Sequence, residues 1–449
     1  MIGTVYQIKK YWMVLLHLTL SPALGCSDSK SDDKTETEEA TNVTPSPRVS
    51  PQPASQPVRS GDGVAASSIS SENTEVTYLG VVAALPENKI SSFWVNPEGL
   101  FTVNHFDGTS WGSASSHQGG DGIVKSVKYA SEASGKIVVT WILDKEAENS
   151  LWARVYNGDT WSDFIQISQS GAISEYEVVT SRSGEFVVVW NDSEQMWMNT
   201  YDGDTWGEAI DLDLTLAGAQ HLNIQVTIDK KIFLAWSSFK EGKRYVWTSA
   251  YYDGQWDSLN LVAQPETEIG LIKSSMTDNG KLALLWKEVA GDKHDVWFSQ
   301  LADTDWLEPV NILSSDKPVK NDHIIIHQNG RAVYSWIEVR DNYDYIFSKV
   351  YDGGFWSEKP LLVAQNLESD SYFKVASDYF SGTHLIWSQT DGSLWMNSLE
   401  TGSSWNGTLR LNASSQDPII DYAISFNKAG RSFITWNQKS SIWFKLGPN

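Results

Sequence analysis

The stretch from Tyr176 to Trp206 decides the fold. It reads YEVV (176–179), GEFVVVW (184–190), MWMNTY (196–201), DG (202–203) and TW (205–206). Each apolar piece is short, rich in β-branched and aromatic residues, and bounded by Gly, Asp, Asn or Ser, which is typical of strands joined by turns. The Asp202-Gly203 step suits a tight hairpin because both residue types tolerate positive φ. The stretch therefore predicts four short strands.

The same unit recurs from about residue 76 onward and is marked by three series of tryptophans. The first series follows an Asp-Gly-like turn, at Trp111, Trp161, Trp206, Trp256, Trp306, Trp356 and Trp405. The second series closes an apolar run, at Trp94, Trp141, Trp190, Trp236, Trp286, Trp336, Trp387 and Trp436. The third lies between them, at Trp152, Trp197, Trp247, Trp297, Trp395 and Trp443, with Phe101 and Phe347 in the two gaps. A four-stranded repeat of about 45 to 50 residues has the size of a propeller blade.

The copies also predict the number of blades. The second and third strands occur eight times, whereas the fourth strand with its Trp occurs seven times. A ring needs its last blade completed, so we predict that residues between Ala65 and Glu75 supply the missing outer strand. Residues 76–449 are therefore predicted to form an all-β fold, a β-propeller of eight four-stranded blades. Seven blades with an irregular leading segment, residues 78–113, is the alternative.

The first 25 residues have the pattern of a signal peptide. Lys9 and Lys10 precede an apolar run, residues 11–20, and small residues lead up to Cys26. The run is shorter than the roughly 20 residues that a membrane-spanning helix needs. Residues 26–75 are rich in Ser, Thr, Pro, Glu and Asp and contain no aromatic residue. This composition predicts a disordered linker between the signal peptide and the propeller.

Cys26 is the only cysteine, so no disulfide can form within one chain. The segment Ala23-Leu24-Gly25-Cys26 resembles the lipobox of bacterial lipoproteins, in which the cysteine is lipidated and becomes the mature amino terminus. The resemblance implies export and lipidation of Cys26, and Ser27 implies sorting to the outer membrane, on its periplasmic side or at the cell surface. Acyl chains would hold the protein to one leaflet without spanning it. An ordinary signal peptide cut near Ala23 is the alternative.

Charge and motifs argue against several classes of partner. The net charge of −22 disfavours nucleic-acid binding, which needs clustered Lys and Arg. The sequence contains no phosphate-cradling glycine loop, Ser-centred elbow or zinc-ligand spacing. His323 and His327 would stand about 13 Å apart on a strand, too far for one metal ion. We therefore expect neither a cofactor nor a metal site.

The turn motif resembles the Asp-box of sialidases and other propellers, whose pattern is Ser-x-Asp-x-Gly-x-x-Trp. In this chain the Asp and Gly are adjacent, as in Asp202-Gly203. The resemblance implies a sialidase-like or lectin-like propeller, in which these Asp residues form turns on the face away from an active site. A sialidase would also need three arginines for the substrate carboxylate, and no family motif surrounds the arginines of the repeats. Sialidase activity itself is therefore not expected.

Candidate ligand-binding residues lie two positions after the second-series Trp. This position is polar in all but one copy, with Asn96, Asp192, Ser238, Glu288, Glu338, Gln389 and Gln438. We predict ligand binding by Asp192, Glu288, Glu338, Gln389 and Gln438, because they enter the rim where propellers usually bind ligands. The alternative is that strand ends next to solvent are polar in any case. A second candidate set stands 13 residues before the same Trp, on strands lining the axis: Lys128, Glu177, Asn223, Lys273 and His323.

Three hypotheses of function follow from the predicted fold. The first is a non-catalytic binding module of the cell envelope that presents its rim to a glycan or a protein. The second is a scaffold in outer-membrane or envelope assembly. The third is a glycosidase or lyase on the same fold, for which the sequence assigns no catalytic residue. We expect a monomer that contacts the membrane only through its lipid anchor.

Overall fold

The computed structural model describes residues 66–447 except 71–75, 85–88, 133–134, 146–147, 159, 170, 172, 182–183, 193–194, 213–218, 228, 278–279, 303, 370, 401, 403 and 414–416. The predicted signal peptide and Cys26 lie outside these residues. Every regular element that the structure describes is a β-strand. Accordingly, no helix within these ranges has the length and apolarity needed to cross a membrane.

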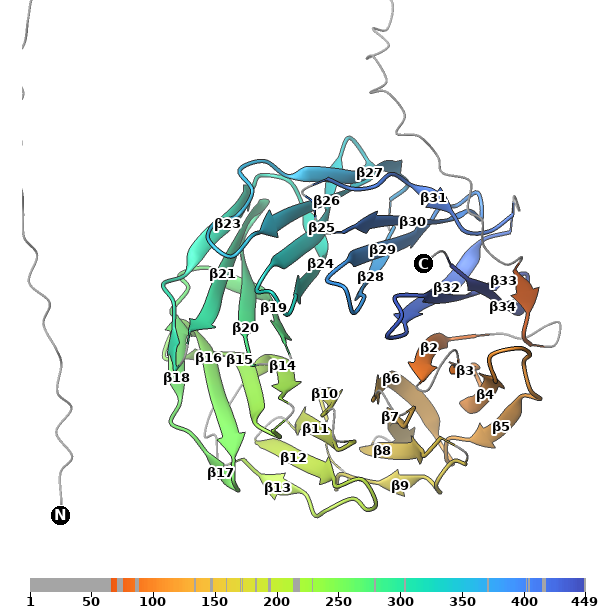
Figure 1. Cartoon of the computed structure of the whole chain (residues 1–449). Coiled ribbons are helices and arrows are strands. Elements are labelled where there is room, and N and C mark those ends of the chain that lie inside the picture. Colours follow the sequence, from red (N-terminus) through yellow and green to blue (C-terminus); the bar gives the residue numbers. More distant parts are fainter. Residues whose placement is uncertain are drawn as a thin grey trace, which may run out of the picture. The chain divides into compact units, whose positions relative to one another are not determined.

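The strands form eight antiparallel sheets arranged in a ring, which is an eight-bladed β-propeller (Figure 1). From first to last strand, blade 1 consists of β2 (Tyr78–Ala84), β3 (Lys89–Val95), β4 (Leu100–Phe106) and β5 (Ser115–Gln118), and blade 2 consists of β6 (Ile123–Ser131), β7 (Ile137–Lys145), β8 (Glu148–Tyr156) and β9 (Ile165–Gln166). Blade 3 consists of β10 (Glu175–Thr180), β11 (Phe186–Asn191), β12 (Met196–Tyr201) and β13 (Ile210–Asp211). Blade 4 consists of β14 (Gln220–Val226), β15 (Ile232–Lys240), β16 (Lys243–Tyr252), β17 (Gln255–Trp256) and β18 (Asn260–Ala263).

Blade 5 consists of β19 (Glu268–Met276), β20 (Leu282–Ala290), β21 (Lys293–Ala302), β22 (Asp305–Trp306) and β23 (Val310–Ser315). Blade 6 consists of β24 (Val319–Ile326), β25 (Ala332–Arg340), β26 (Tyr343–Tyr351) and β27 (Leu361–Leu367), and blade 7 consists of β28 (Phe373–Ser377), β29 (Thr383–Ser388), β30 (Leu394–Leu399) and β31 (Leu409–Arg410). Blade 8 consists of β32 (Ile419–Phe426), β33 (Ser432–Gln438), β34 (Ser441–Leu446) and β1 (Ser67–Ser68). The first strand of each blade lies innermost and contacts the first strands of its two neighbours. These eight inner strands surround the axis of the ring.

The amino-terminal strand β1 closes the ring by completing blade 8. Ser67 and Ser68 pair with Phe444 and Trp443 of β34, and the N–H of Ile69 donates to the Ile442 carbonyl at 2.8 Å. Ile69 is 6% exposed. This confirms both the count of eight blades and the prediction that residues 65–75 supply the missing strand. The end of the predicted linker therefore belongs to the propeller.

The tryptophans pack the blades against one another. Every second-series Trp is at most 3% exposed. First-series tryptophans contact the preceding blade: Trp306 Nε1 donates to Thr248 Oγ1 at 2.9 Å, and Trp405 Nε1 donates to Ser348 Oγ at 2.8 Å. Trp111 packs edge-on against Phe444, with ring centroids 4.9 Å apart, so blade 1 contacts blade 8 in the same way. Burying these rings between blades is a large apolar stabilisation that a single blade could not achieve.

The two faces of the ring carry different turns. Since neighbouring strands are antiparallel, turns between first and second strands and between third and fourth strands share one face, which we call the Asp-Gly face. Loops between second and third strands lie on the other, the hairpin face. On the first, Asp202 Oδ1 accepts the N–H groups of Asp204 and Thr205 at 2.9 and 2.8 Å, and Gly203 has a φ of 109°. Such aspartates form turns, as the sequence predicts.

Candidate functional site

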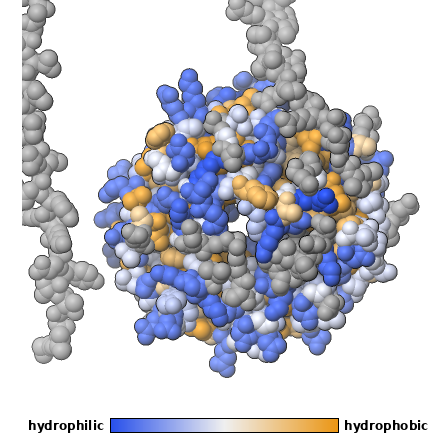
Figure 2. Space-filling model, viewed as in Figure 1, coloured by the Kyte–Doolittle hydropathy of each residue, from blue (hydrophilic) through white to orange (hydrophobic). Residues whose placement is uncertain are grey.

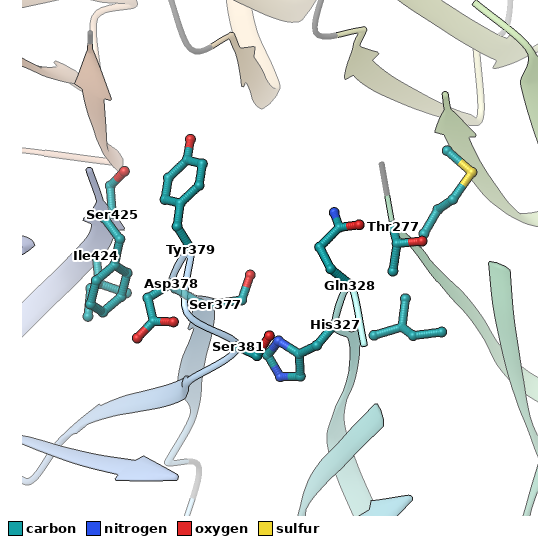
Figure 3. Close-up of a pocket in the computed structure, with 13 residues that line it drawn as sticks. Thr277, His327, Gln328, Ser377, Asp378, Tyr379, Ser381, Ile424 and Ser425 are labelled. Atoms are coloured by element: carbon teal, nitrogen blue, oxygen red, sulfur yellow. The ribbon is translucent and has the colours of Figure 1, made fainter. Parts of the chain in front are cut away.

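A pocket of about 500 Å³ opens where the inner strands β19, β24, β28 and β32 end beside the axis (Figure 3). It lies on the Asp-Gly face, not on the opposite face that the Asp-box resemblance implies for a site. Its polar wall consists of Thr277, His327, Gln328, Ser377, Asp378, Tyr379, Ser381 and Ser425. Its apolar wall consists of Met276, Ile326, Ala376, Ile424 and Phe426. On the molecular face shown in Figure 2, hydrophilic and hydrophobic residues are interspersed around the centre of the ring. Blades 5 to 8 thus bring polar groups, mostly neutral ones, together next to the axis.

One repeating position supplies several side chains of the pocket wall. It lies nine residues before the second-series Trp. In blades 2 to 8 this position holds Glu132, Ser181, Thr227, Thr277, His327, Asp378 and Asn427. In most copies its side chain accepts the backbone N–H four residues later, as Thr277 does from Lys281 at 2.9 Å and Asn427 from Arg431 at 3.0 Å. These side chains cap the turn that ends each inner strand. Sequence reasoning missed this series, although its regular spacing was visible.

Asp378 shows how the capping position fixes a charge in the pocket wall. Its Oδ1 accepts the N–H groups of Phe380 and Gly382 at 2.8 and 2.7 Å, and its Oδ2 lies 2.9 Å from His384 Nε2. Burial acts to raise the pKa of this carboxyl, but the hydrogen bonds from His384 and Gly382 outweigh it and lower the pKa to about 2. The carboxylate is therefore ionised and held in one orientation.

The other ring nitrogen of His384 contacts a serine. Its Nδ1 lies 2.8 Å from Ser398 Oγ, so Asp378, His384 and Ser398 form a row like that of a nucleophilic triad. In blade 1 the same two strand positions carry the pair in reverse order, Ser91 and His105, also at 2.8 Å. Ser398 does not line the pocket described here. The row therefore serves pairing between the second and third strands and positions Asp378.

His327 departs from the capping pattern. Its Nε2 lies 2.8 Å from Thr383 Oγ1 of blade 7. The N–H of Arg331, four residues later, donates instead to Asn329 Oδ1 at 3.0 Å. The His327 side chain is buried, with only 4% of the residue exposed. Burial, and then the positive charge of Arg331, lowers the pKa of His327 to about 4. The imidazole is therefore neutral at neutral pH and ties blade 6 to blade 7.

An aromatic side chain stands at the pocket opening. Tyr379 is 45% exposed, and Figure 3 shows its ring and the side chain of Gln328 extending from the wall into open space. The turn that presents Tyr379 is held by the two N–H contacts to Asp378, and Ser381 adopts a φ of 69° to complete it. The ring is thus presented by a well-defined turn rather than by a long loop.

The predicted rim residues lie on the hairpin face, at the opposite ends of the sheets from this pocket. Glu288 accepts hydrogen bonds from Thr267 Oγ1 at 3.1 Å and Trp286 Nε1 at 3.3 Å. Glu338 is buried and accepts from Arg340 Nε at 2.6 Å. Each acid therefore stabilises its own blade and the segment that leads into it. None of the five predicted rim residues lines the pocket at the Asp-Gly face.

The other three rim residues also have local partners. Asp192 accepts from Trp197 Nε1 at 2.7 Å, and Gln389 Oε1 accepts from Ser393 Oγ at 3.2 Å. The Gln438 amide donates to the carbonyls of Gly392 and Asp417 at 2.9 and 2.7 Å. These contacts give a structural reason for the repeating polarity. A role for the five residues in ligand binding stays a prediction.

The second predicted set, on the inner strands, joins neighbouring blades. Lys128 Nζ pairs with Glu177 Oε1 at 2.7 Å, and Asn223 Oδ1 accepts the N–H of Ser274 at 2.9 Å. His323 lies against Phe373, with ring centroids 5.1 Å apart. Burial, and then the charge of Lys273, lowers the pKa of His323 to about 4. These residues hold adjacent inner strands together around the axis.

The described part of the chain contains no group of three or more His, Cys, Asp or Glu side chains arranged to hold a metal ion. Asp378 is the one carboxylate in the pocket wall given above. The site therefore offers hydroxyl, amide, imidazole and aromatic groups for binding. It is suited to hydrogen bonding and stacking with an uncharged polar ligand.

No protein-family model matches the sequence, and no curated protein is significantly similar to it. Solved structures that resemble the chain include the polysaccharide lyase Uly1, at 9% identity and a TM-score of 0.47, covering 73% of this chain and 89% of that one. A six-bladed fucose-recognising lectin from Aleuria aurantia follows at 11% identity and a TM-score of 0.39, covering 76% and 98%. The NanB sialidase from Streptococcus pneumoniae has 9% identity and a TM-score of 0.37, covering 86% and 93%. The chain's own strand order makes it an eight-bladed propeller, and these distant likenesses carry no ligand or activity over to it.

Proposed function

We propose that this propeller is a non-catalytic carbohydrate-binding module of the cell envelope. The observation that carries the proposal is the pocket at the Asp-Gly face, where hydroxyl groups from blades 5, 7 and 8 and the Gln328 amide of blade 6 line the same hollow as Tyr379. Sugars present many hydroxyl groups, which need both donors and acceptors. Ser, Thr and Gln side chains supply both. The exposed phenol ring adds a flat apolar surface for the C–H face of a sugar ring.

The size of the pocket favours a glycan over a folded protein as the ligand. Its volume of about 500 Å³ falls within the range of roughly 300 to 1,000 Å³ that is typical of small-molecule sites. A stable protein interface usually buries about 800 Å² on each partner. A hollow that accepts one or two sugar rings suits the end of an oligosaccharide. The scaffold hypothesis therefore has less support from this site than the glycan hypothesis.

The pocket also favours binding over glycoside hydrolysis. That reaction usually needs two carboxyl groups about 5 to 10 Å apart, and the described pocket wall contains one, Asp378. Asp378 has a pKa of about 2 and already accepts hydrogen bonds from Phe380, Gly382 and His384. It is thus a poor general acid and lacks a partner carboxylate in that wall. Glu288 and Glu338 lie at the other ends of the sheets.

The proposal predicts that Tyr379 carries much of the affinity. We expect Tyr379→Ala to weaken binding of an oligosaccharide identified on a glycan array by about fivefold to tenfold, because stacking on an aromatic ring contributes about 1 to 1.4 kcal/mol. Isothermal titration calorimetry on the purified full-length protein measures the change. The matched control is Phe355→Ala, which removes a ring that is 74% exposed on an Asp-Gly-like turn outside the pocket. Equal affinities in both variants would contradict the proposed site.

We propose further that the module is an exported lipoprotein. The support is the signal-peptide pattern of residues 1–25 and the lipobox-like segment that ends at Cys26. Acylation of Cys26 would hold the propeller at the outer membrane, and the residues up to Ala65 would serve as a tether. A binding module at the cell envelope would meet polysaccharides there. The protein would contact the membrane through its lipid anchor alone.

A further inference from the structure

We infer that the pocket selects uncharged sugars and discriminates against glycans that carry carboxylate or sulfate groups. This inference rests on the proposed function and adds the chemical class of the ligand. Three features of the pocket support it: one fixed negative charge in the wall, a nearby cation that has other partners, and several neutral polar groups.

The fixed charge is the carboxylate of Asp378. Two backbone N–H groups and the His384 ring hold it in place, at 2.7 to 2.9 Å. These contacts use the carboxylate in the turn, so it cannot rotate away from an incoming anion. The wall therefore carries a negative charge that an acidic sugar would have to approach.

The cation of the turn that carries His327, Arg331, donates to other partners. The guanidinium of Arg331 donates to the backbone carbonyls of Glu400 and Gly402 on blade 7, and the residue is buried. His327 directs its Nε2 to Thr383 and is neutral at neutral pH. Among the described residues that line the pocket there is no Lys or Arg. An anionic group would therefore lose water without gaining a counterion.

The remaining polar groups match an uncharged sugar. Gln328 and the hydroxyls of Ser377 and Ser425 can donate or accept hydrogen bonds without a change in charge. A second anion about 5 Å from Asp378 would be repelled, and at effective dielectric constants of about 20 to 80 this weakens binding roughly fourfold to a few hundredfold. We therefore expect acidic analogues to bind at least about tenfold more weakly than neutral ones of the same length.

The test compares neutral and acidic oligosaccharides of matched length on the purified full-length protein. Calorimetry with galacto- and galacturono-oligosaccharides, and with gluco- and glucurono-oligosaccharides, gives the ratio of affinities within each pair. Two variants then change the charge of the pocket, Asp378→Asn and Gln328→Lys. Each should improve the relative affinity for the acidic member about tenfold. The matched control is Asp352→Asn, which removes an aspartate that caps an Asp-Gly turn of the same face outside the pocket; its ratio should stay unchanged.

The outcomes separate this inference from the function on which it rests. Preference for the neutral member, reduced in both charge variants, supports the inference. Equal or tighter binding of the acidic member overturns the selectivity but leaves carbohydrate binding intact. If no oligosaccharide binds at millimolar concentration while the circular dichroism spectrum and melting temperature show a folded protein, both proposals are wrong. Because Gln328→Lys leaves the Asp378 turn intact, misfolding of Asp378→Asn alone does not decide the result.

Discussion

At the scale of single residues, one position of the repeat varies from blade to blade while another is constant. The second-series tryptophans are buried in every blade, whereas the position nine residues earlier changes from Thr277 to His327 to Asp378 in consecutive blades. A turn can be capped by several side chains, so its chemistry can vary without loss of the blade. The pocket therefore acquires its character from residues that the fold leaves free to differ.

The lowered pKa of buried His327 predicts how the stability of the protein depends on pH. Its pKa is lowered from 6.5 to about 4 in the folded protein, so the unfolded chain binds a proton at a higher pH than the folded one. The stability that His327 contributes is present above pH 6.5 and is lost as the pH falls from 6.5 to about 4. The shift corresponds to up to about 3 kcal/mol. Urea unfolding of the protein at several pH values between 4 and 7 measures this loss.

The variant His327→Gln should lose less stability over the same range, because the amide does not titrate. The comparison variant is His117→Gln, whose ring, on β5 of blade 1, is more exposed and lies near Arg154 of blade 2. It should change the pH dependence less. If His327→Gln and the unmodified protein show the same fall between pH 7 and pH 4, the imidazole is not held neutral by the fold.

At the scale of elements, one of the shortest strands closes the ring. β1 has two residues, yet it pairs with β34 and so joins the beginning of the propeller to its end. Asn104 Nδ2 of blade 1 also donates to the Ile69 carbonyl at 3.1 Å. The segment therefore contacts both blades that flank the closure. Without it β34 would be an open edge, which invites pairing with another chain.

Deletion of the closing strand should destabilise the whole ring. Removing residues 2–75 eliminates β1, buried Ile69 and the hydrogen bonds of Ile69 with Ile442 and Asn104. Burial of one Ile contributes about 1.5 to 3 kcal/mol and each hydrogen bond about 1 kcal/mol. We expect the free energy of unfolding to fall by about 3 kcal/mol or more and the protein to self-associate. Urea unfolding and size-exclusion chromatography measure the two effects.

The matched control is deletion of residues 2–60, which leaves β1 and Ile69 in place. Its stability should equal that of the full-length chain, and it should elute as a monomer. A point variant tests the same contact with less disruption: Ile69→Ala should cost about 2 kcal/mol or more, whereas Ser68→Ala should cost little because its backbone makes the pairing. Equal stability of the two deletions would show that closure does not depend on β1.

At the scale of the whole molecule, the ring makes each blade dependent on its neighbours. First-series tryptophans reach the preceding blade, and inner-strand residues such as Lys128 and Glu177 join adjacent blades around the axis. A closed ring buries both sides of every blade, which an open stack of the same repeats cannot do.

The proposed anchor predicts where the protein partitions. In a bacterium that processes lipoproteins, the unmodified protein should enter the detergent phase of a Triton X-114 separation, because acyl chains on Cys26 favour the apolar phase. Cys26→Ser should enter the aqueous phase. As a control, Ser27→Asp should stay in the detergent phase but move to the inner-membrane fraction. Recovery of the unmodified protein in the aqueous phase would refute the anchor.

Much of the fold could be predicted from the sequence because its signals are local and periodic. The tryptophan spacing, the Asp-Gly steps and the missing eighth copy of the outer strand gave eight blades and the closing segment, and the structure confirms them. The repeating polarity after the second-series Trp suggested a binding rim. In the structure, however, Asp192, Glu288 and Gln438 each have partners close by. Repetition alone could not distinguish a contact that stabilises every blade from one that binds a ligand.

The sequence by itself determined the blade, the number of blades and the need for closure, because strand periodicity and turn chemistry are properties of neighbouring residues. Only the tertiary structure decided where a pocket forms. Thr277, His327, Asp378 and Ser425 lie about 50 residues apart along the chain and converge only when the ring closes. That convergence depends on how far each blade is rotated from the last, which is set by packing between blades rather than by any local sequence pattern.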